Sequence, residues 1–153
     1  MLIVGEGPAR EWFQNRLPNA VFTGFQGGPD LGRAVASMDM LFNPSDTETF
    51  GYVTLEAMAC GLPTVAARAT GSESLVTDGV TGRLIRPGAI GDFADALQQY
   101  CDDSAARARA GEAARARAER NGWDQVNQAL VDTYLRVIRQ RAQGMVLRSS
   151  PVP

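Results

Sequence analysis

The chain has 153 residues, of which 44% are hydrophobic and 21% charged, and a formal net charge of −2. This is room for one domain with a sizeable core, without the basic surplus typical of nucleic-acid-binding proteins, so we expect no nucleic-acid partner. No apolar run is long enough to span a membrane, and residues 1–5 are too short for a signal peptide. The only cysteines, Cys60 and Cys101, are predicted to be reduced and half-buried in a cytoplasmic protein, and the absence of histidine argues against a zinc site.

The first segments predict two strands separated by a helix. Residues 1–5 form an apolar run ending in Gly5, which is typical of a buried parallel strand. A helix is predicted over residues 9–17 and a second strand over residues 20–23. A glycine-rich loop follows, and Asp30 is predicted to cap a short helix.

The middle of the chain predicts a strand that runs into a helix. Residues 38–44 contain a short apolar core, and the helix is predicted over residues 50–60, ended by Gly61. Thr49 is predicted to cap this helix with its hydroxyl, and Gly51 leaves the first turn without a side chain. Such a helix start offers unpaired N–H groups and a partial positive charge to an anion, most often a phosphate.

Two acidic residues accompany this helix start. Glu48 lies just before it, and Glu56 lies about 9 Å along the axis, at about 1.5 Å per residue. That distance matches the separation of a diphosphate and the ribose attached to it. A carboxylate at this position can accept hydrogen bonds from two neighbouring ribose hydroxyls. Glu48 would face the group on the other side of the diphosphate. Alternatively, both are solvated glutamates, with Glu48 favoured by the helix dipole.

The remaining sequence predicts strands over residues 64–67 and 83–86, with helices beginning at Thr70, Asp92, Ser104 and Trp123. The arginine-rich helix over residues 104–120 is predicted to be a solvated surface helix, with peripheral contact to the inner membrane face as the alternative. The last helix carries an apolar stripe that is predicted to pack in the core: Trp123, Val126, Leu130, Tyr134 and Val137.

Alternating strands and helices predict an α/β fold, a Rossmann-like parallel sheet with helices on both faces. Ligands in such sheets bind beyond the carboxyl ends of the strands, where Gly5, Gly24, Thr49 and Gly71 fall. We predict one nucleotide-sugar-binding domain over residues 1–142 and a frayed tail over residues 143–153.

The spacing of Glu48 and Glu56 resembles the Glu-x7-Glu signature of retaining GT-B glycosyltransferases, above all glycosyltransferase family 4. The resemblance covers roughly residues 1–140 and includes these further segments: 4–8, 22–24, 57–65, 71–75, 78–84 and 87–88. Several motifs in the right order make it specific.

The resemblance implies the donor-binding half of a retaining hexosyltransferase that uses a UDP- or GDP-sugar and needs no metal or other cofactor. It assigns the donor sugar and its developing positive charge to Glu48, the ribose to Glu56, and the nucleobase to the neighbourhood of Gly24 and Phe25. The donor-binding residues would be Gly5, Gly24, Phe25, Glu48, Thr49, Phe50, Gly51 and Glu56.

The chain also departs from the family pattern. The family's donor-binding domain begins with a strand that carries an arginine and, shortly after, a lysine, and both hold the donor diphosphate. This chain begins after that strand, and its 15 basic residues are all arginine. We therefore expect a fold that lacks its first strand, an acceptor bound by a separate N-terminal domain, and no activity from the isolated chain.

Two other functions remain open from the sequence. One is a non-catalytic nucleotide-binding or interaction module. The other is a GT-B-type sugar-nucleotide epimerase, which would need acid–base residues that the sequence does not offer. An in-frame acceptor domain in the upstream reading frame would favour the transferase.

Overall fold

The computed structural model describes the backbone of residues 1–148 and the side chains of residues 1–142. It divides into two compact units, Met1–Ala118 and Glu119–Pro153. The last helix continues to Arg148, which makes residues 143–148 helical; the rest of the predicted tail, residues 149–153, lies outside the described residues.

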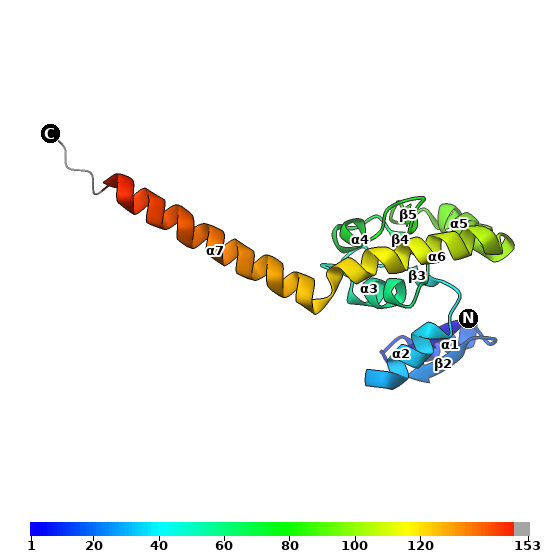
Figure 1. Ribbon diagram of the computed structural model, residues 1–153. Helices are drawn as coiled ribbons and strands as arrows, with labels where there is room; N and C mark the ends of the chain where they lie inside the picture. The colour runs from blue at the N-terminus through cyan, green and yellow to red at the C-terminus, as the bar shows by residue number, and fades with distance from the viewer. Residues whose placement is uncertain (149–153) are drawn as a thin grey trace. The chain divides into compact units, whose positions relative to one another are not determined.

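The described residues form five strands, which all lie in the first unit and pair in parallel (Figure 1). Strand β1 (Leu2–Val4) pairs with β2 (Val21–Gly24), and a second sheet has the order β3 (Leu41–Asn43), β4 (Thr64–Ala67), β5 (Gly82–Ile85). The predicted α/β class with parallel strands is confirmed. The strands form two sheets instead of one, because no described strand joins β1 to β3.

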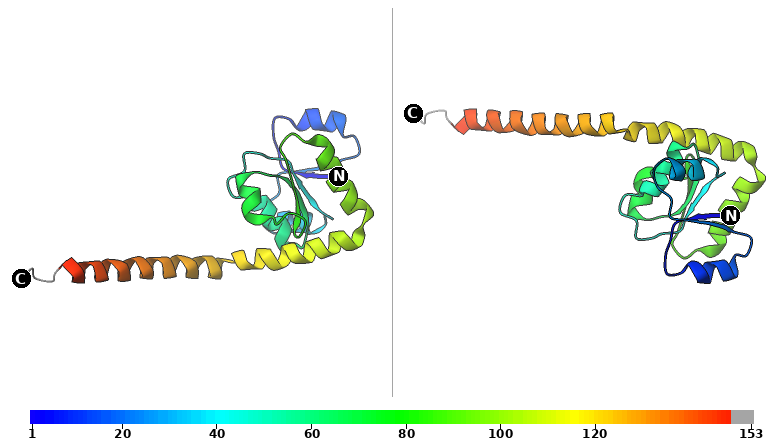
Figure 2. Two further views of the ribbon diagram at one scale, coloured as in Figure 1. Left: turned by 90° about the horizontal axis from the view of Figure 1, so that it is seen from above. Right: turned by 90° about the horizontal axis from the view of Figure 1, so that it is seen from below.

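Helices alternate with these strands, and their bounds are α1 Arg10–Arg16, α2 Gly28–Ala36, α3 Tyr52–Ala59, α4 Thr70–Leu75, α5 Ile90–Asp102 and α6 Ser104–Ala118. The second unit contains a short 3-10 turn, Glu119–Asn121, and α7, Trp123–Arg148. Figure 2 shows α5 and α6 joined end to end at a bend.

Both predicted helix caps are wrong. Helix α2 begins at Gly28, so Asp30 lies inside its first turn, where it pairs with Arg33. Helix α3 begins after Gly51, whose φ of +91° is a backbone conformation that glycine adopts readily. This turn leaves Thr49 two residues outside the cap position, and no described side chain caps α3.

The core of the first unit surrounds β4, whose four residues are all buried. On one side, Val65 and Ala67 pack with Phe93 and Tyr100 of α5. Met58 of α3, in a separate cluster, packs with α4 and α6. The first cluster thus joins α5 to the sheet, and the second joins α3 to α4 and α6.

Residues 104–118 form the predicted surface helix, α6, but one of its faces is buried. Its small residues Ala110, Gly111, Ala114 and Ala118 are buried, and α6 packs on α3 (Figure 1). A Cβ placed on Gly111 would lie 2.2 Å from the carbonyl oxygen of Gly61, so the two backbones touch here.

Two arginines of α6 bind the ends of neighbouring helices. Arg115 donates to the carbonyl of Ala59, and Arg117 donates to the carbonyls of Leu75 and Ser74. Carbonyls at the end of a helix lack intrahelical partners, so guanidinium donors satisfy them.

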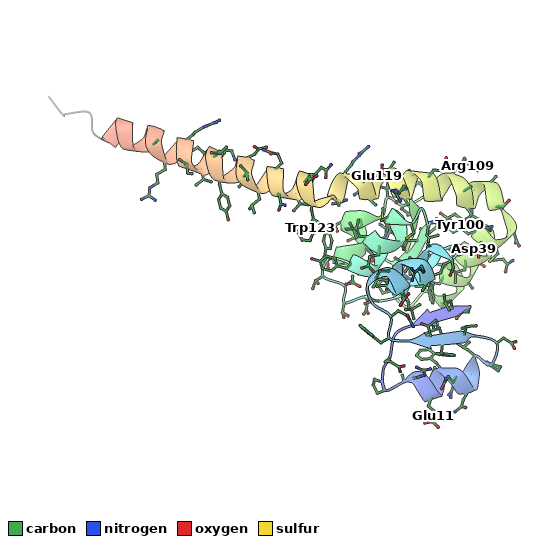
Figure 3. The ribbon with its side chains drawn as sticks, turned by 60° about the horizontal axis from the view of Figure 1, so that its bottom comes forward. Glu11, Asp39, Tyr100, Arg109, Glu119 and Trp123 are labelled. Carbon is green, nitrogen blue, oxygen red and sulfur yellow. The ribbon has the colours of Figure 1, made fainter. Side chains whose placement is uncertain are left out.

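The apolar stripe of α7 is exposed, so the prediction that it packs in the core is wrong for the described residues. Its five side chains are between 47% and 78% exposed, with Trp123 the highest (Figure 3). Cys60 and Cys101 are likewise exposed free thiols instead of half-buried ones. Over the described residues, no helix combines the length and apolarity that crossing a membrane requires.

Candidate functional site

The loop between β3 and α3 begins at Asn43, which links the strand to the helix. The Asn43 amide donates to Thr54 Oγ1 at 3.4 Å and accepts from the backbone N–H of Ser45 at 3.2 Å. Thr54 is completely buried in α3. Asn43 therefore connects the end of β3 both to the first residues of the loop and to the buried side of α3.

The far end of this loop is bound to the start of α4. The Glu48 carbonyl oxygen accepts two hydrogen bonds of 3.0 Å, from the backbone N–H of Gly71 and from Thr70 Oγ1. Strands β3 and β4 are parallel neighbours, so the segments that follow them meet at one edge of the sheet. The structure thus brings Glu48 and Gly71 together, as the strand order requires.

The half-buried Glu48 side chain lies against two glycines. A Cβ on Gly71 would lie 2.9 Å from Glu48 Cγ, and a Cβ on Gly51 would lie 3.4 Å from the same atom. The Glu48 methylene group therefore occupies a slot that exists because both positions lack a side chain.

The start of α3 combines polar backbone with exposed aromatic rings. Helix α3 has no capping side chain among the described residues, so its N-terminus retains the partial positive charge of a helix start. Phe50 and Tyr52 are 38% and 70% exposed, with ring centroids 5.1 Å apart. An anion could contact the backbone amides here, beside an apolar surface.

Glu56 is exposed on α3, about 7.5 Å beyond Gly51 at about 1.5 Å per residue. The helix begins later than predicted, so Glu56 lies closer to the helix start than the sequence suggested. Its carboxylate can accept hydrogen bonds from two neighbouring hydroxyls of a ligand that extends along α3.

The other predicted site residues meet at the carboxyl ends of β1 and β2. The Gly5 N–H donates to the Gly24 carbonyl at 2.8 Å, and both glycines have positive φ. Phe25 follows with its ring 80% exposed. Glu6 and Arg10 form an ion pair next to Gly24.

Two contacts that support the loop between β3 and α3 were not predicted from the sequence. They are the hydrogen bond from the Thr70 hydroxyl to the Glu48 carbonyl and the one from the Asn43 amide to Thr54. Thr70 was predicted only as the start of a helix, and both residues belong to types that are common at strand and helix ends. Among the described residues, no three histidine, cysteine, aspartate or glutamate side chains are grouped to hold a metal ion.

Curated relatives align with most of the chain. It is 40% identical over 125 residues to a sulfoquinovosyl transferase of Arabidopsis thaliana, an alignment that covers 78% of this chain and 24% of that protein. It is 45% identical over 106 residues to a D-inositol 3-phosphate glycosyltransferase of Kribbella flavida, covering 69% of this chain and 25% of the relative. The chain thus spans about a quarter of the length of these relatives.

Solved structures of glycosyltransferases have the same fold. The crystal structure of HepE from Anabaena in complex with UDP matches with a TM-score of 0.78 at 30% identity, covering 88% of this chain and 40% of that one. Sucrose-phosphate synthase from Thermosynechococcus elongatus matches with a TM-score of 0.78 at 26% identity, covering 91% and 38%.

A family model described as "Glycosyl transferases group 1" matches residues 1–103, which include β1 to β5, the Glu48 loop and Glu56. The parallel strands flanked by helices agree with the GT-B glycosyltransferase structures that the chain resembles. The chain belongs to the glycosyl transferases group 1 family.

Proposed function

We propose that this chain is the donor-binding half of a family 4 glycosyltransferase that transfers a hexosyl group from a UDP- or GDP-sugar with retention of configuration and without a metal ion. The observation that carries the proposal is the uncapped start of α3 with one glutamate on each side of it. Relatives support both nucleotides: HepE was crystallised with UDP-glucose, and a Corynebacterium glutamicum relative is a GDP-mannose-dependent mannosyltransferase.

In this proposal the backbone amides of Thr49, Phe50 and Gly51 hold the diphosphate. A helix start favours an anion through its unpaired N–H groups and its dipole. Glu56 then accepts hydrogen bonds from the ribose hydroxyls. The exposed ring of Phe25, beyond β2, offers an apolar surface for the nucleobase.

Glu48 contacts the donor sugar in this proposal and stabilises the positive charge that develops on it. Glycosyl transfer with retention passes through an oxocarbenium-like state in which positive charge develops on the sugar. A carboxylate beside the sugar attracts that charge more strongly in the transition state than in the ground state, so it accelerates the reaction. The slot between Gly51 and Gly71 fixes the Glu48 methylene group and limits the positions that the carboxylate can reach.

The proposal includes an acceptor domain and a cationic diphosphate clamp on a separate N-terminal segment. A helix start contributes only about 0.3–1 kcal/mol toward an exposed anion, so this chain alone should bind nucleotides weakly and transfer no sugar. The exposed free thiols of Cys60 and Cys101 fit a reducing compartment such as the cytoplasm.

Nuclear magnetic resonance tests the donor site on the chain itself. Millimolar UDP or GDP should shift the amide signals of residues 49–52 and of Glu56, and Glu56→Gln should abolish the shift at position 56. The matched control is Glu73→Gln, at an exposed glutamate of α4 outside the proposed site. Shifts confined to other segments would contradict the assignment.

Kinetics test the chemistry in the two-domain enzyme, meaning this domain together with an acceptor domain. Glu56→Gln should weaken free nucleotide and donor alike, because a ribose contact persists from ground state to transition state. Glu48→Gln should lower kcat about 10-fold or more with nucleotide affinity nearly intact. Activity that survives metal chelation would support transfer without a metal ion. A product with the anomeric configuration of the donor would support retention.

A further inference from the structure

We propose that Thr70 and Gly71, in the first turn of α4, are positioning residues for Glu48, an inference that rests on the proposed role of Glu48 in sugar transfer. Neither residue needs to touch a ligand in this role. They act by fixing the backbone and the side chain of the loop residue that does.

The backbone of Glu48 is fixed by two donors from one turn. Its carbonyl oxygen accepts from Thr70 Oγ1 and from the Gly71 N–H, each at 3.0 Å. One bond alone would let the peptide group tilt about it. Two donors from separate atoms define the direction of the carbonyl and, through it, the start of the Glu48 side chain.

Gly71 also excludes every larger side chain from its position. Besides Glu48 Cγ, a Cβ there would lie 2.9 Å from the Glu48 carbonyl oxygen and 2.9 Å from the Phe50 N–H nitrogen. Two of these three atoms are backbone, so the clash cannot be relieved by a side-chain rotation. An alanine at position 71 would have to move the loop over residues 48–50, which includes Glu48 and two of the three proposed diphosphate amides, those of Thr49 and Phe50.

Glu56 should be spared by such a shift. It lies on α3, whose packing comes from Met58 and Ala57 against α6 and α2. The proposal therefore separates two effects: loss of Glu48 placement, which lowers the rate of transfer, and loss of ribose binding, which Glu56 governs.

The experiment uses Gly71→Ala with Gly91→Ala as its matched control. Gly91 is also the second residue of a helix, α5, but a Cβ there would meet nothing within 4 Å. In the two-domain enzyme, Gly71→Ala should lower kcat by roughly 10- to 100-fold, the effect expected for a misplacement of about 1 Å. The donor KM should rise less than kcat falls, and Gly91→Ala should change neither.

Thr70 supplies a milder variant in case Gly71→Ala does not fold. Thr70→Val keeps the shape but removes the hydroxyl donor, and Thr70→Ser keeps the donor. We expect Thr70→Val to lower kcat and Thr70→Ser to restore most of it. In the Glu48→Gln background both Thr70→Val and Gly71→Ala should cost much less, because the carboxylate whose position they set is gone.

Two failures are distinguishable. If Glu48→Gln leaves kcat unchanged, the proposed role of Glu48 is wrong, and the positioning role is overturned with it. If Glu48→Gln lowers kcat but Gly71→Ala and Thr70→Val match wild type, only the positioning role is overturned. The amide signals of residues 48–51 in the chain alone give an independent readout, since Gly71→Ala should shift them and Gly91→Ala should not.

Discussion

Helices α6 and α7 follow one another in the chain, yet their surfaces behave in opposite ways. The apolar face of α6 consists of alanine and glycine and is buried. The apolar stripe of α7 contains large residues such as Trp123 and Leu130 and is exposed. Figure 3 labels Arg109 on α6 and Trp123 at the start of α7.

The difference teaches that burial depends on the partner surface as much as on side-chain size. Small residues allow two helices to approach until their backbones touch, as Gly111 does at Gly61. Dispersion and apolar burial then come from backbone and Cβ atoms. The spacing of large apolar residues in the sequence predicts that a helix has one apolar face, but it does not predict which other element packs against that face.

Gly111→Ala should disrupt the buried face of α6 and lower the stability of the chain. The added Cβ would lie 2.2 Å from the Gly61 carbonyl oxygen, so α6 and α3 would have to separate. We expect a loss of about 1–3 kcal/mol in the free energy of unfolding, the range typical of overpacking. Urea unfolding followed by circular dichroism measures it.

The matched control for that prediction is again Gly91→Ala. In open space, alanine in place of a helical glycine stabilises by up to about 1 kcal/mol, so the two variants should shift stability in opposite directions. A stabilised Gly111→Ala variant would show that the α3–α6 contact is looser than described.

Arg117→Gln should have a smaller effect. It removes the guanidinium donors to the Leu75 and Ser74 carbonyls at the end of α4, and we expect a loss of about 1 kcal/mol. Arg109→Gln, at an exposed position of the same helix, should stay within about 0.5 kcal/mol of wild type. Equal stabilities for the two variants would mean that the hydrogen bonds from Arg117 to the end of α4 add nothing to the free energy of unfolding.

Much of the fold was predictable because strand periodicity and glycine signals are local. The strand at Thr64–Ala67 and the helix stop at Gly61 follow from apolar runs and from a backbone that favours glycine. The burial of Gly111 was not predictable, because it depends on a residue 50 positions earlier in the chain. Sequence periodicity therefore predicts which residues share a face of a helix, whereas the tertiary contacts determine which of those faces is buried.

The candidate site divides in the same way. Spacing alone placed Glu48 and Glu56 on the two sides of a helix start, and the strand order placed Gly71 at the same sheet edge. The cap was mispredicted at Thr49 because the left-handed turn of Gly51 moves the helix start to Tyr52. The double hydrogen bond to the Glu48 carbonyl joins segments 22 residues apart, so no local pattern contains it.

The buried side chain of Tyr100 on α5 should make the stability of the chain depend on pH in the alkaline range. Burial raises the pKa of Tyr100 from its ordinary value of 10.0, Arg83 opposes this and Asp78 adds to it. The folded chain therefore holds the phenol proton after the unfolded chain has lost it. Stability from this group is complete below pH 10 and falls as pH rises above it. Tyr100→Phe should remove that decline, which unfolding measured at several alkaline pH values would detect.

Leu130→Ser on α7 should have the smallest effect of all. The Leu130 side chain is 50% exposed, and an exposed substitution usually changes the free energy of unfolding by less than about 0.5 kcal/mol. The matched control is Leu75→Ser, because Leu75 is only 2% exposed in the cluster that joins α3, α4 and α6. That variant should lose about 2–5 kcal/mol, as large-to-small core substitutions do. Urea unfolding of both variants at neutral pH decides the matter. A loss above about 1 kcal/mol for Leu130→Ser would contradict the exposure of the stripe on which this comparison of α6 and α7 rests.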